Sequence, residues 1–347
     1  MTIVRQPERL SALSPQELAH VLDAASHARL LGWLLSRLEE SPRPGSDPEW
    51  LSDRLADARA LATEYDRSLR WEIDRIGRAF AGLNLPWVLL KGAAYLAAGL
   101  PPGRGRRVAD IDVLVPEDRL ADAERALREH GWDFGELTAY DERYYREWMH
   151  ELPPMAHRER RSIVDLHHAL LPRTSRLKPS SARLFAPAVP TLSGSRVLSP
   201  AHMVLHAAVH LFHDGEVAGA LRDLVDLDGL VRHFASIPSF WPGFFEEARA
   251  LGLERPAYYA VRYSSRLAGT AIPARALEEI ETMAPNSPNR MLMDRLVERT
   301  LPGESGPGSS VAAWALYVRS HWLRMPARML VGHLARKAIE KARKSQE

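Results

Sequence analysis

Two acidic residues at the start of an apolar segment are the first sign of chemistry in this chain. Asp110 and Asp112 alternate with the apolar residues of segment 110–115. On a β-strand, residues i and i+2 project from the same face, so the two carboxylates would lie side by side. A bound cation relieves their repulsion, and oxygen ligands suit Mg2+. The spacing therefore predicts a magnesium site on a strand, although an isolated Asp-x-Asp also occurs in turns and surface pairs.

A third acid, Asp165, lies in a later segment with strand-like alternation. Residues 162–168 predict a strand on which Asp165 projects from the face opposite Val164 and Leu166. If the two strands were antiparallel neighbours, they would bring all three acids to one metal site. Two Mg2+ ions bridged by such acids can activate a hydroxyl and hold a triphosphate for in-line displacement. The alternative for Asp165 is an acid at a strand end with a structural role.

Lys91 and Gly92 stand between an apolar strand, 87–90, and a short helix, 93–98. A glycine at such a turn lets a phosphate approach the backbone, and the helix N-terminus offers N–H donors and a partial positive charge. Lys91 would add a formal charge, or would instead pair with an acid. Three further cations precede the acid pair and would meet phosphates or remain solvated: Arg104, Arg106 and Arg107.

Together, these segments resemble the polymerase-β-type nucleotidyltransferase superfamily, and more narrowly a bacterial family of uncharacterised nucleotidyltransferases. The similarity covers residues 85–230 and rests on Leu-Leu-Lys91-Gly92-Ala93, Asp110-Ile-Asp112-Val-Leu-Val, a helix ending at Gly131-Trp132, and Val-Asp165-Leu-His167. The resemblance implies a small mixed sheet flanked by helices, followed by a helical domain that closes over the nucleotide. It also implies that Asp110, Asp112 and Asp165 are catalytic and bind two Mg2+ ions, and that Lys91, Gly92, Ala93 and Arg106 contact the phosphates of an NTP.

One position departs from the superfamily pattern, and two others match the narrower family. The superfamily usually has a phosphate-binding serine after the glycine, whereas this chain has Ala93; the Lys-Gly form is usual in the narrower family. Arg106 matches a family arginine four residues before the first metal aspartate. Asp226 matches a recurrent acid, which would orient Arg222 or an active-site group, or act as a base.

Three histidines recur every fourth residue: His202, His206 and His210. They would share one face of a helix, where a pair at i and i+4 can chelate Zn2+. The acid motif of zinc proteases does not accompany them, and the matching family helix also tends to carry histidines. We therefore expect packing or hydrogen bonding near the active cleft.

The composition is that of a globular protein with two or three domains: 347 residues, 46% hydrophobic, 26% charged, with a net charge of +2. The absence of cysteine excludes disulfides, thiolate zinc sites and cysteine nucleophiles. We expect an α+β, mostly helical protein with a small mixed sheet of nucleotidyltransferase type. Its parts would be a helical N-terminal region (1–84), the nucleotidyltransferase core (85–195) and a C-terminal helical domain with a basic tail (196–347).

The remaining patterns give the other elements. Ser14-Pro15-Gln16-Glu17 predicts a capping box at a helix start. Further helices are expected over 48–82, 117–130, 199–212, 217–234, 239–251, 255–268, 273–283, 288–300 and 311–344, the last kinked at Pro326, and a further strand over 132–137. Segment 140–148 would be a helix or a lid. Breaks are expected at 41–47 and 301–310, and 172–195 would be a loop with one short helix.

Two features of the sequence indicate where in the cell the protein would be found. The N-terminus lacks a positive region followed by an apolar one, so we expect no signal peptide, and no apolar run reaches 18 residues, so we expect no membrane span and a cytoplasmic protein. The basic residues towards the C-terminus would contact nucleic acid or an anionic membrane, or form a solvated face.

The resulting hypothesis is a Mg2+-dependent nucleotidyltransferase. It would move a nucleoside monophosphate from ATP or another NTP to a hydroxyl-type acceptor (a small molecule, sugar, peptide, protein or RNA) and release pyrophosphate. One alternative is a non-catalytic nucleotide- or partner-binding module on a degenerate transferase fold. A metal-dependent glycosyltransferase is disfavoured, because several βα units generally precede the Asp-x-Asp of those enzymes.

Overall fold

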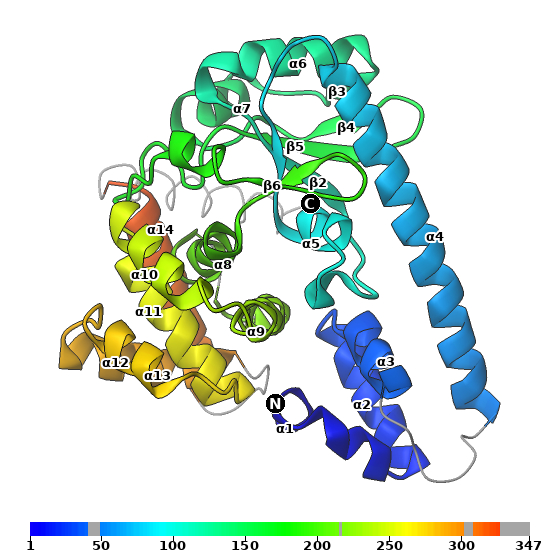
Figure 1. Cartoon of the computed structure of the whole chain (residues 1–347), viewed down its shortest axis with the longest axis vertical. Helices are drawn as coiled ribbons and strands as arrows, with labels where there is room; N and C mark the ends of the chain where they lie inside the picture. Colours follow the sequence, from blue (N-terminus) through cyan, green and yellow to red (C-terminus); the bar gives the residue numbers. More distant parts are fainter. Residues whose placement is uncertain (41–48, 215–216, 302–307, 327–347) are drawn as a thin grey trace, which may run out of the picture.

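The fold is α+β and mostly helical, with one seven-stranded mixed sheet, as expected from the sequence (Figure 1). The computed structural model describes residues 1–40, 49–214, 217–301 and 308–326. The expected break at 41–47, most of that at 301–310 and the basic stretch up to 344 lie outside these residues. In the described part of the chain, no helix is long and apolar enough to cross a membrane.

The strand order in the sheet is β3-β4-β5-β2-β1-β7-β6. The strands are β1 (Val88–Leu89), β2 (Asp110–Leu114), β3 (Trp132–Phe134), β4 (Met155–His157), β5 (Ile163–His167), β6 (Val189–Pro190) and β7 (Arg196–Val197). The central strand β2 pairs antiparallel with β1 and parallel with β5. The acid pair therefore opens the strand in the middle of the sheet.

The expected antiparallel pairing of the two acid-bearing strands is wrong, because β2 and β5 run parallel. Parallel neighbours need a long connection. Here it comprises η3 (Glu117–Arg119), α6 (Leu120–Glu129), β3, α7 (Ala139–Arg143), η4 (Tyr144–Trp148) and β4. The consequence that matters for the site is unchanged, since parallel neighbours also place same-face side chains next to each other.

Three short strands were not expected from the sequence. Strand β4 joins the sheet between β3 and β5, and β6 and β7 form a small antiparallel pair within and just after the stretch expected to be a loop. The short helix expected in that stretch is η5 (Ser181–Leu184). Strands of two or three residues are too short to show a periodic pattern, so burial and pairing with neighbours decide their formation.

The N-terminal region is helical, as expected. It comprises α1 (Thr2–Arg5), η1 (Pro7–Ala12), α2 (Pro15–His27), α3 (Leu31–Glu40) and α4 (Glu49–Phe80). The capping box is confirmed, because Ser14 Oγ accepts a hydrogen bond from the Glu17 N–H and the Glu17 carboxylate accepts one from the Ser14 N–H. Helix α4 joins two cores: Leu51 and Leu55 pack with α2 and α3, and its last turns pack on the sheet.

Helices also follow the sheet, close to their expected bounds. They are α8 (Pro200–Val209), η6 (His210–Asp214), α9 (Leu221–Phe234), α10 (Phe240–Ala250), α11 (Glu254–Tyr263), η7 (Ser264–Ala268), α12 (Ala274–Glu281), α13 (Ser287–Thr300) and α14 (Ser309–Arg324). Helix α14 ends before Pro326. Figure 1 shows α8 and α9 between the sheet and the outer helices α10–α14. Through α8 and α9 the C-terminal half reaches the central strands.

The main hydrophobic core contains residues from the sheet, from α4 and from the C-terminal helices. A second, smaller core joins α2, α3 and the start of α4. Helix α5 (Lys91–Ala97) and the turn η2 (Pro101–Gly103) connect β1 to β2. The division at residues 84 and 195 stays a prediction.

Candidate active site

The three predicted acids lie on adjacent strands at the centre of the sheet. Asp112 on β2 and Asp165 on β5 are direct partners in the parallel register. Asp110 opens β2 and lies opposite Ile163. The Asp112 side chain is buried, whereas Asp110 and Asp165 are partly exposed. The fold thus brings together the carboxylates that were predicted from two segments more than fifty residues apart.

The Asp112 carboxylate accepts two hydrogen bonds from side chains. It accepts one from Lys91 Nζ at 2.6 Å and one from His167 Nε2 at 2.9 Å, both at Oδ1. Burial alone would raise the pKa of the Asp112 carboxyl, but the Lys91 charge and the His167 hydrogen bond outweigh it and hold this pKa well below its usual range. Asp112 is therefore ionised at neutral pH.

Lys91 pairs with an acid in this structure, which was the stated alternative to phosphate contact. Burial opposes its charge, but Asp112 outweighs burial and raises the pKa of Lys91. The backbone of Lys91 has φ of 46°, in the left-handed region that non-glycine residues rarely adopt. This conformation turns the chain from β1 into α5. The Leu90 N–H donates to the Asp112 carbonyl oxygen at 2.9 Å, so the hairpin register brings Lys91 next to Asp112.

Asp165 has the opposite electrostatic environment. Burial, followed by the charges of Asp112 and Glu151, raises the pKa of Asp165 to about 7. Its Oδ1 is buried and has no hydrogen-bond partner among the described residues. A buried carboxylate oxygen without a partner is costly unless an ion or water satisfies it. Three carboxylates with one unsatisfied oxygen fit the all-oxygen ligand set of Mg2+.

His150 and Glu151 lie beside these acids and were missed by the sequence reasoning. Glu151 bridges to His167 through the backbone, and its Oε2 lies 3.2 Å from His167 Nε2. Burial raises the pKa of Glu151 and lowers that of His150. The two residues lie between η4 and β4, outside any helix or strand, so no periodic pattern marks them. Only the pairing of this segment with β5 brings them into the site.

Arg106 is partly buried on the other side of the Lys-Gly turn. Its guanidinium forms an ion pair with Asp226 of α9 and lies 5.4 Å from the centre of the Tyr95 ring. A Cβ at position 92 would lie 2.5 Å from Arg106 Nε, so Gly92 is what allows this close approach. Burial lowers the pKa of Arg106. Asp226 therefore orients Arg106, while Arg222 donates a hydrogen bond to the Arg107 carbonyl oxygen at 3.1 Å.

Ala93 is fully buried in the main core beside this turn. Its methyl group packs inside the protein, and it offers no hydroxyl. The contact of Gly92 and Ala93 with phosphate stays a prediction.

The histidines of α8 and η6 do not converge on one point. His202 Nε2 lies 2.8 Å from a carboxylate oxygen of Glu247, and His213 Nε2 lies 2.9 Å from Ser175 Oγ. His206 and His210 are close enough to Lys91 for its charge, after burial, to lower their pKa. Hydrogen bonding and proximity to the candidate site thus agree with the expectation. In the described ranges, the grouped potential metal ligands are instead His150, Glu151 and His167.

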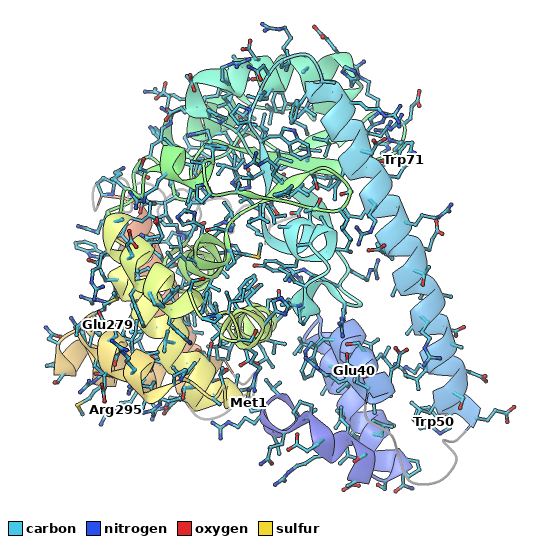
Figure 2. The ribbon with its side chains drawn as sticks, viewed as in Figure 1. Met1, Glu40, Trp50, Trp71, Glu279 and Arg295 are labelled. Atoms are coloured by element: carbon cyan, nitrogen blue, oxygen red, sulfur yellow. The ribbon has the colours of Figure 1, made fainter. Side chains whose placement is uncertain are left out.

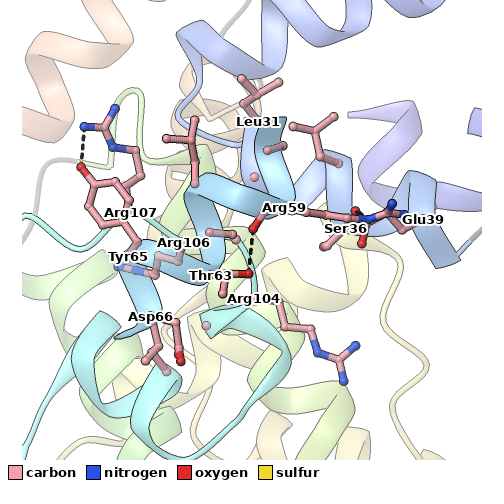
Figure 3. Close-up of a pocket in the computed structure, with 18 of the residues that line it drawn as sticks. Leu31, Ser36, Glu39, Arg59, Thr63, Tyr65, Asp66, Arg104, Arg106 and Arg107 are labelled. Carbon is pink, nitrogen blue, oxygen red and sulfur yellow. Dashed lines mark hydrogen bonds and ion pairs between the residues drawn. The ribbon is translucent and has the colours of Figure 1, made fainter. Parts of the chain in front are cut away.

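A cavity of about 740 Å³ lies between α3, α4 and the arginine loop (Figure 3). Arg107 donates a hydrogen bond to the Tyr65 hydroxyl at 2.8 Å, and Arg59 to a Glu39 carboxylate oxygen at 2.6 Å. Arg106 lines the cavity and also contacts Asp226. Figure 2 shows how densely side chains fill the region between the sheet and the helices. The arginine loop therefore separates this cavity from the acids.

The sequence of the chain was also compared with known proteins. A family model described as uncharacterised nucleotidyltransferase matches residues 14–269, which is more than half of the chain. A search of curated proteins finds no match. The matched range includes all of the predicted site residues and Asp226.

Proposed function

The chain belongs to the uncharacterised nucleotidyltransferase family, and we propose that it transfers a nucleoside monophosphate from an NTP to a hydroxyl-type acceptor. Pyrophosphate would be released, and the reaction would depend on Mg2+. The observation that carries this proposal is the pairing of Asp112 on β2 with Asp165 on the adjacent parallel strand β5. Asp110 is the first residue of β2.

Asp110, Asp112 and Asp165 are the residues that would hold the metal. The unsatisfied Oδ1 of Asp165 supports this role, because the described residues offer it no donor. When bound, Mg2+ would lower the pKa of the acceptor hydroxyl and neutralise charge on the triphosphate. The Lys91 charge and the His167 hydrogen bond keep Asp112 ionised, and its place on β2 fixes this ligand in the sheet.

Lys91 and Arg106 are the cations that would bind the phosphates. Lys91 Nζ is one hydrogen bond from Asp112, so its ammonium stands next to the proposed metal ligands. The Nε of Arg106 is buried beside Gly92 and has no hydrogen-bond partner in the described part of the chain. Asp226 fixes the guanidinium. Such preorganised charges stabilise a phosphoryl-transfer transition state without reorganising during the reaction.

Asp110→Asn is the sharpest test. Asp110 is partly exposed and lies at a strand end, so its replacement leaves the Lys91–Asp112 pair in place. The protein would be incubated with each labelled NTP, Mg2+ and cell extract as a source of acceptor, and label transfer and pyrophosphate would be measured. We expect Asp110→Asn to lower both at least about a hundredfold. Asp118→Asn, at an exposed acid outside the site, is the matched control and should retain activity.

Full activity of Asp110→Asn would refute the assignment. The non-catalytic binding module stays as a second candidate, favoured by the buried methyl of Ala93 where a hydroxyl is usual. It predicts NTP binding that does not depend on Mg2+ and no turnover with any of the extracts. Calorimetric titration with and without Mg2+ separates the two functions.

A further inference from the structure

Two imidazoles and one carboxylate form a cluster to which the proposed transfer reaction assigns no contact with metal or phosphate. The cluster consists of His150, Glu151 and His167, and one potential ligand atom from each lies within 4.8 Å of the other two. Glu151 Oε2 is 3.2 Å from His167 Nε2 and 3.8 Å from His150 Nε2. All three side chains thus point their donor atoms at a common region.

The backbone holds this cluster in place. His167 ends β5, and Glu151 pairs with it in an isolated antiparallel bridge. The His168 N–H donates to the His150 carbonyl oxygen at 2.9 Å, which ties the second imidazole to the same strand. Ligands fixed by neighbouring backbone lose little conformational freedom on binding an ion.

The distances suit a small metal ion with nitrogen and oxygen ligands. Bonds of about 2.0–2.1 Å in a tetrahedral zinc site place neighbouring ligand atoms roughly 3.4 Å apart. The separations from Glu151 Oε2, 3.2 and 3.8 Å, lie on either side of that value. Two histidines and one glutamate are also the ligand set of a class of zinc sites that keep a fourth position open. Small side-chain movements would close the geometry.

Burial and charge also favour a bound cation. His150 and His167 are both buried, and Nδ1 of each has no hydrogen-bond partner among the described residues. Glu151 has two imidazoles within ion-pair distance, and Lys91, whose charge also acts on Glu151, pairs directly with Asp112. A divalent ion bound between the three side chains would compensate the charge of the partly buried Glu151 carboxylate.

We propose that His150, Glu151 and His167 bind Zn2+ at a site beside the three aspartates. Imidazole ligands favour zinc over magnesium, whose preferred ligands are oxygens. His167 Nε2 donates a hydrogen bond to Asp112 Oδ1 at 2.9 Å, so zinc bound at this nitrogen would replace that hydrogen bond and lie directly beside the aspartates. This proposal does not rest on the transferase activity, because zinc binding can be measured without turnover.

The test is a metal titration of the full chain after removal of metals by a chelator and dialysis. Co2+ is the spectroscopic probe, since its visible absorption is strong in a tetrahedral site and weak in an octahedral oxygen site, and Zn2+ is the competitor. We expect one equivalent of Co2+ per chain, displaced by one equivalent of Zn2+ and retained in a large excess of Mg2+. His150→Ala and Glu151→Gln should each weaken binding about a hundredfold.

Two further variants separate this site from other possibilities. His130→Ala, at the exposed histidine that follows α6, is the matched control and should bind as the wild type does. Asp110→Asn should lose nucleotidyl transfer and keep its Zn2+ affinity, so that failure of either proposal is seen independently. Circular dichroism of each variant checks folding, and Glu151→Gln conserves side-chain size.

Three results would overturn the zinc site. The first is that the wild type binds no Co2+ with visible absorption. The second is that His150→Ala and Glu151→Gln both bind like the wild type, and the third is that Mg2+ displaces Co2+ at equal concentration. The second result would assign the metal to other histidines of the chain. The third would assign it to the aspartates alone.

Discussion

The ion pair between Lys91 and Asp112 should couple the stability of the sheet to the candidate site. Asp112 is 2% exposed, and the Lys91 side chain 25%. Removing one partner of a buried pair leaves the other charge uncompensated, at a typical cost of about 3–5 kcal/mol. Because water reaches part of Lys91, we expect Asp112→Asn to cost about 3 kcal/mol, at the lower end of that range.

Removing the lysine of the pair should cost less stability than removing the aspartate. In Lys91→Met, Asp112 keeps the hydrogen bond from His167, so we expect a loss of about 2 kcal/mol. The double variant removes both charges and leaves neither one unpaired. Its cost should fall short of the sum of the single costs by about 2 kcal/mol, which is the coupling energy of the pair.

Urea denaturation at pH 7 measures these free energies. The smaller N-terminal core is separate from the main one, so the transition of the main core should be followed, by tryptophan fluorescence. Trp132 is fully buried there. A matched cycle on the exposed pair Glu64–Arg67 of α4 should show no coupling beyond error. Additive costs at Lys91 and Asp112 would refute the reasoning.

The pH dependence has a defined sign. Asp112 has a lower pKa in the native protein than in the unfolded chain. Its contribution to stability is therefore complete above the unfolded value, about 4, and is lost as the pH falls through the native value. The coupling energy measured at pH 7 should thus persist at pH 5, and acid should weaken it.

Three further outcomes follow from the geometry. Gly92→Ala should destabilise the protein by about 1–3 kcal/mol, because its Cβ would lie 2.5 Å from Arg106 Nε; an unchanged melting temperature would contradict this. Mg2+ affinity should weaken as the pH falls through about 7, because burial and nearby carboxylates raise the pKa of Asp165 to about 7 and protons then compete with the ion. Calorimetry at pH 6 and pH 8 measures this affinity, and equal affinities at the two pH values would contradict the prediction. Asp226→Asn should cost about 3 kcal/mol in urea denaturation, since it leaves Arg106 buried without its counter-charge; a cost within error of zero would show that the pair contributes little.

Local sequence patterns predicted the elements that carry strong local signals. The Ser14–Glu17 capping box and the alternation around Asp112 and Asp165 each have a physical cause within a few residues, and the structure has a helix or strand at each place. Strand direction has no such local cause, because alternation is the same in parallel and antiparallel strands. The wrong pairing of β2 and β5 follows from that. Strands β6 and β7 are only two residues long, and their pairing depends on neighbours.

The site also contains residues that local patterns could predict and residues that they could not. Asp110, Asp112 and Asp165 could be proposed from strand periodicity and the family resemblance. Glu151 could not, because it lies in an irregular segment and its contact with His167 comes from the bridge to β5. The partner of Lys91 could not be chosen either. The register between β1 and β2 determines it, and that register places Lys91 beside Asp112.

Arg106 shows why a predicted phosphate contact and an observed ion pair need not exclude each other. A guanidinium has five N–H donors, and one carboxylate accepts two at most in a bidentate pair. Asp226 pairs with Arg106, and Arg106 Nε remains without a partner in the described part of the chain. The ion pair therefore fixes the orientation of the guanidinium and leaves its buried Nε donor unsatisfied. Because Asp226 belongs to α9 and Arg106 to the loop before β2, the cation in the candidate site depends on a carboxylate from the helical region that follows the sheet.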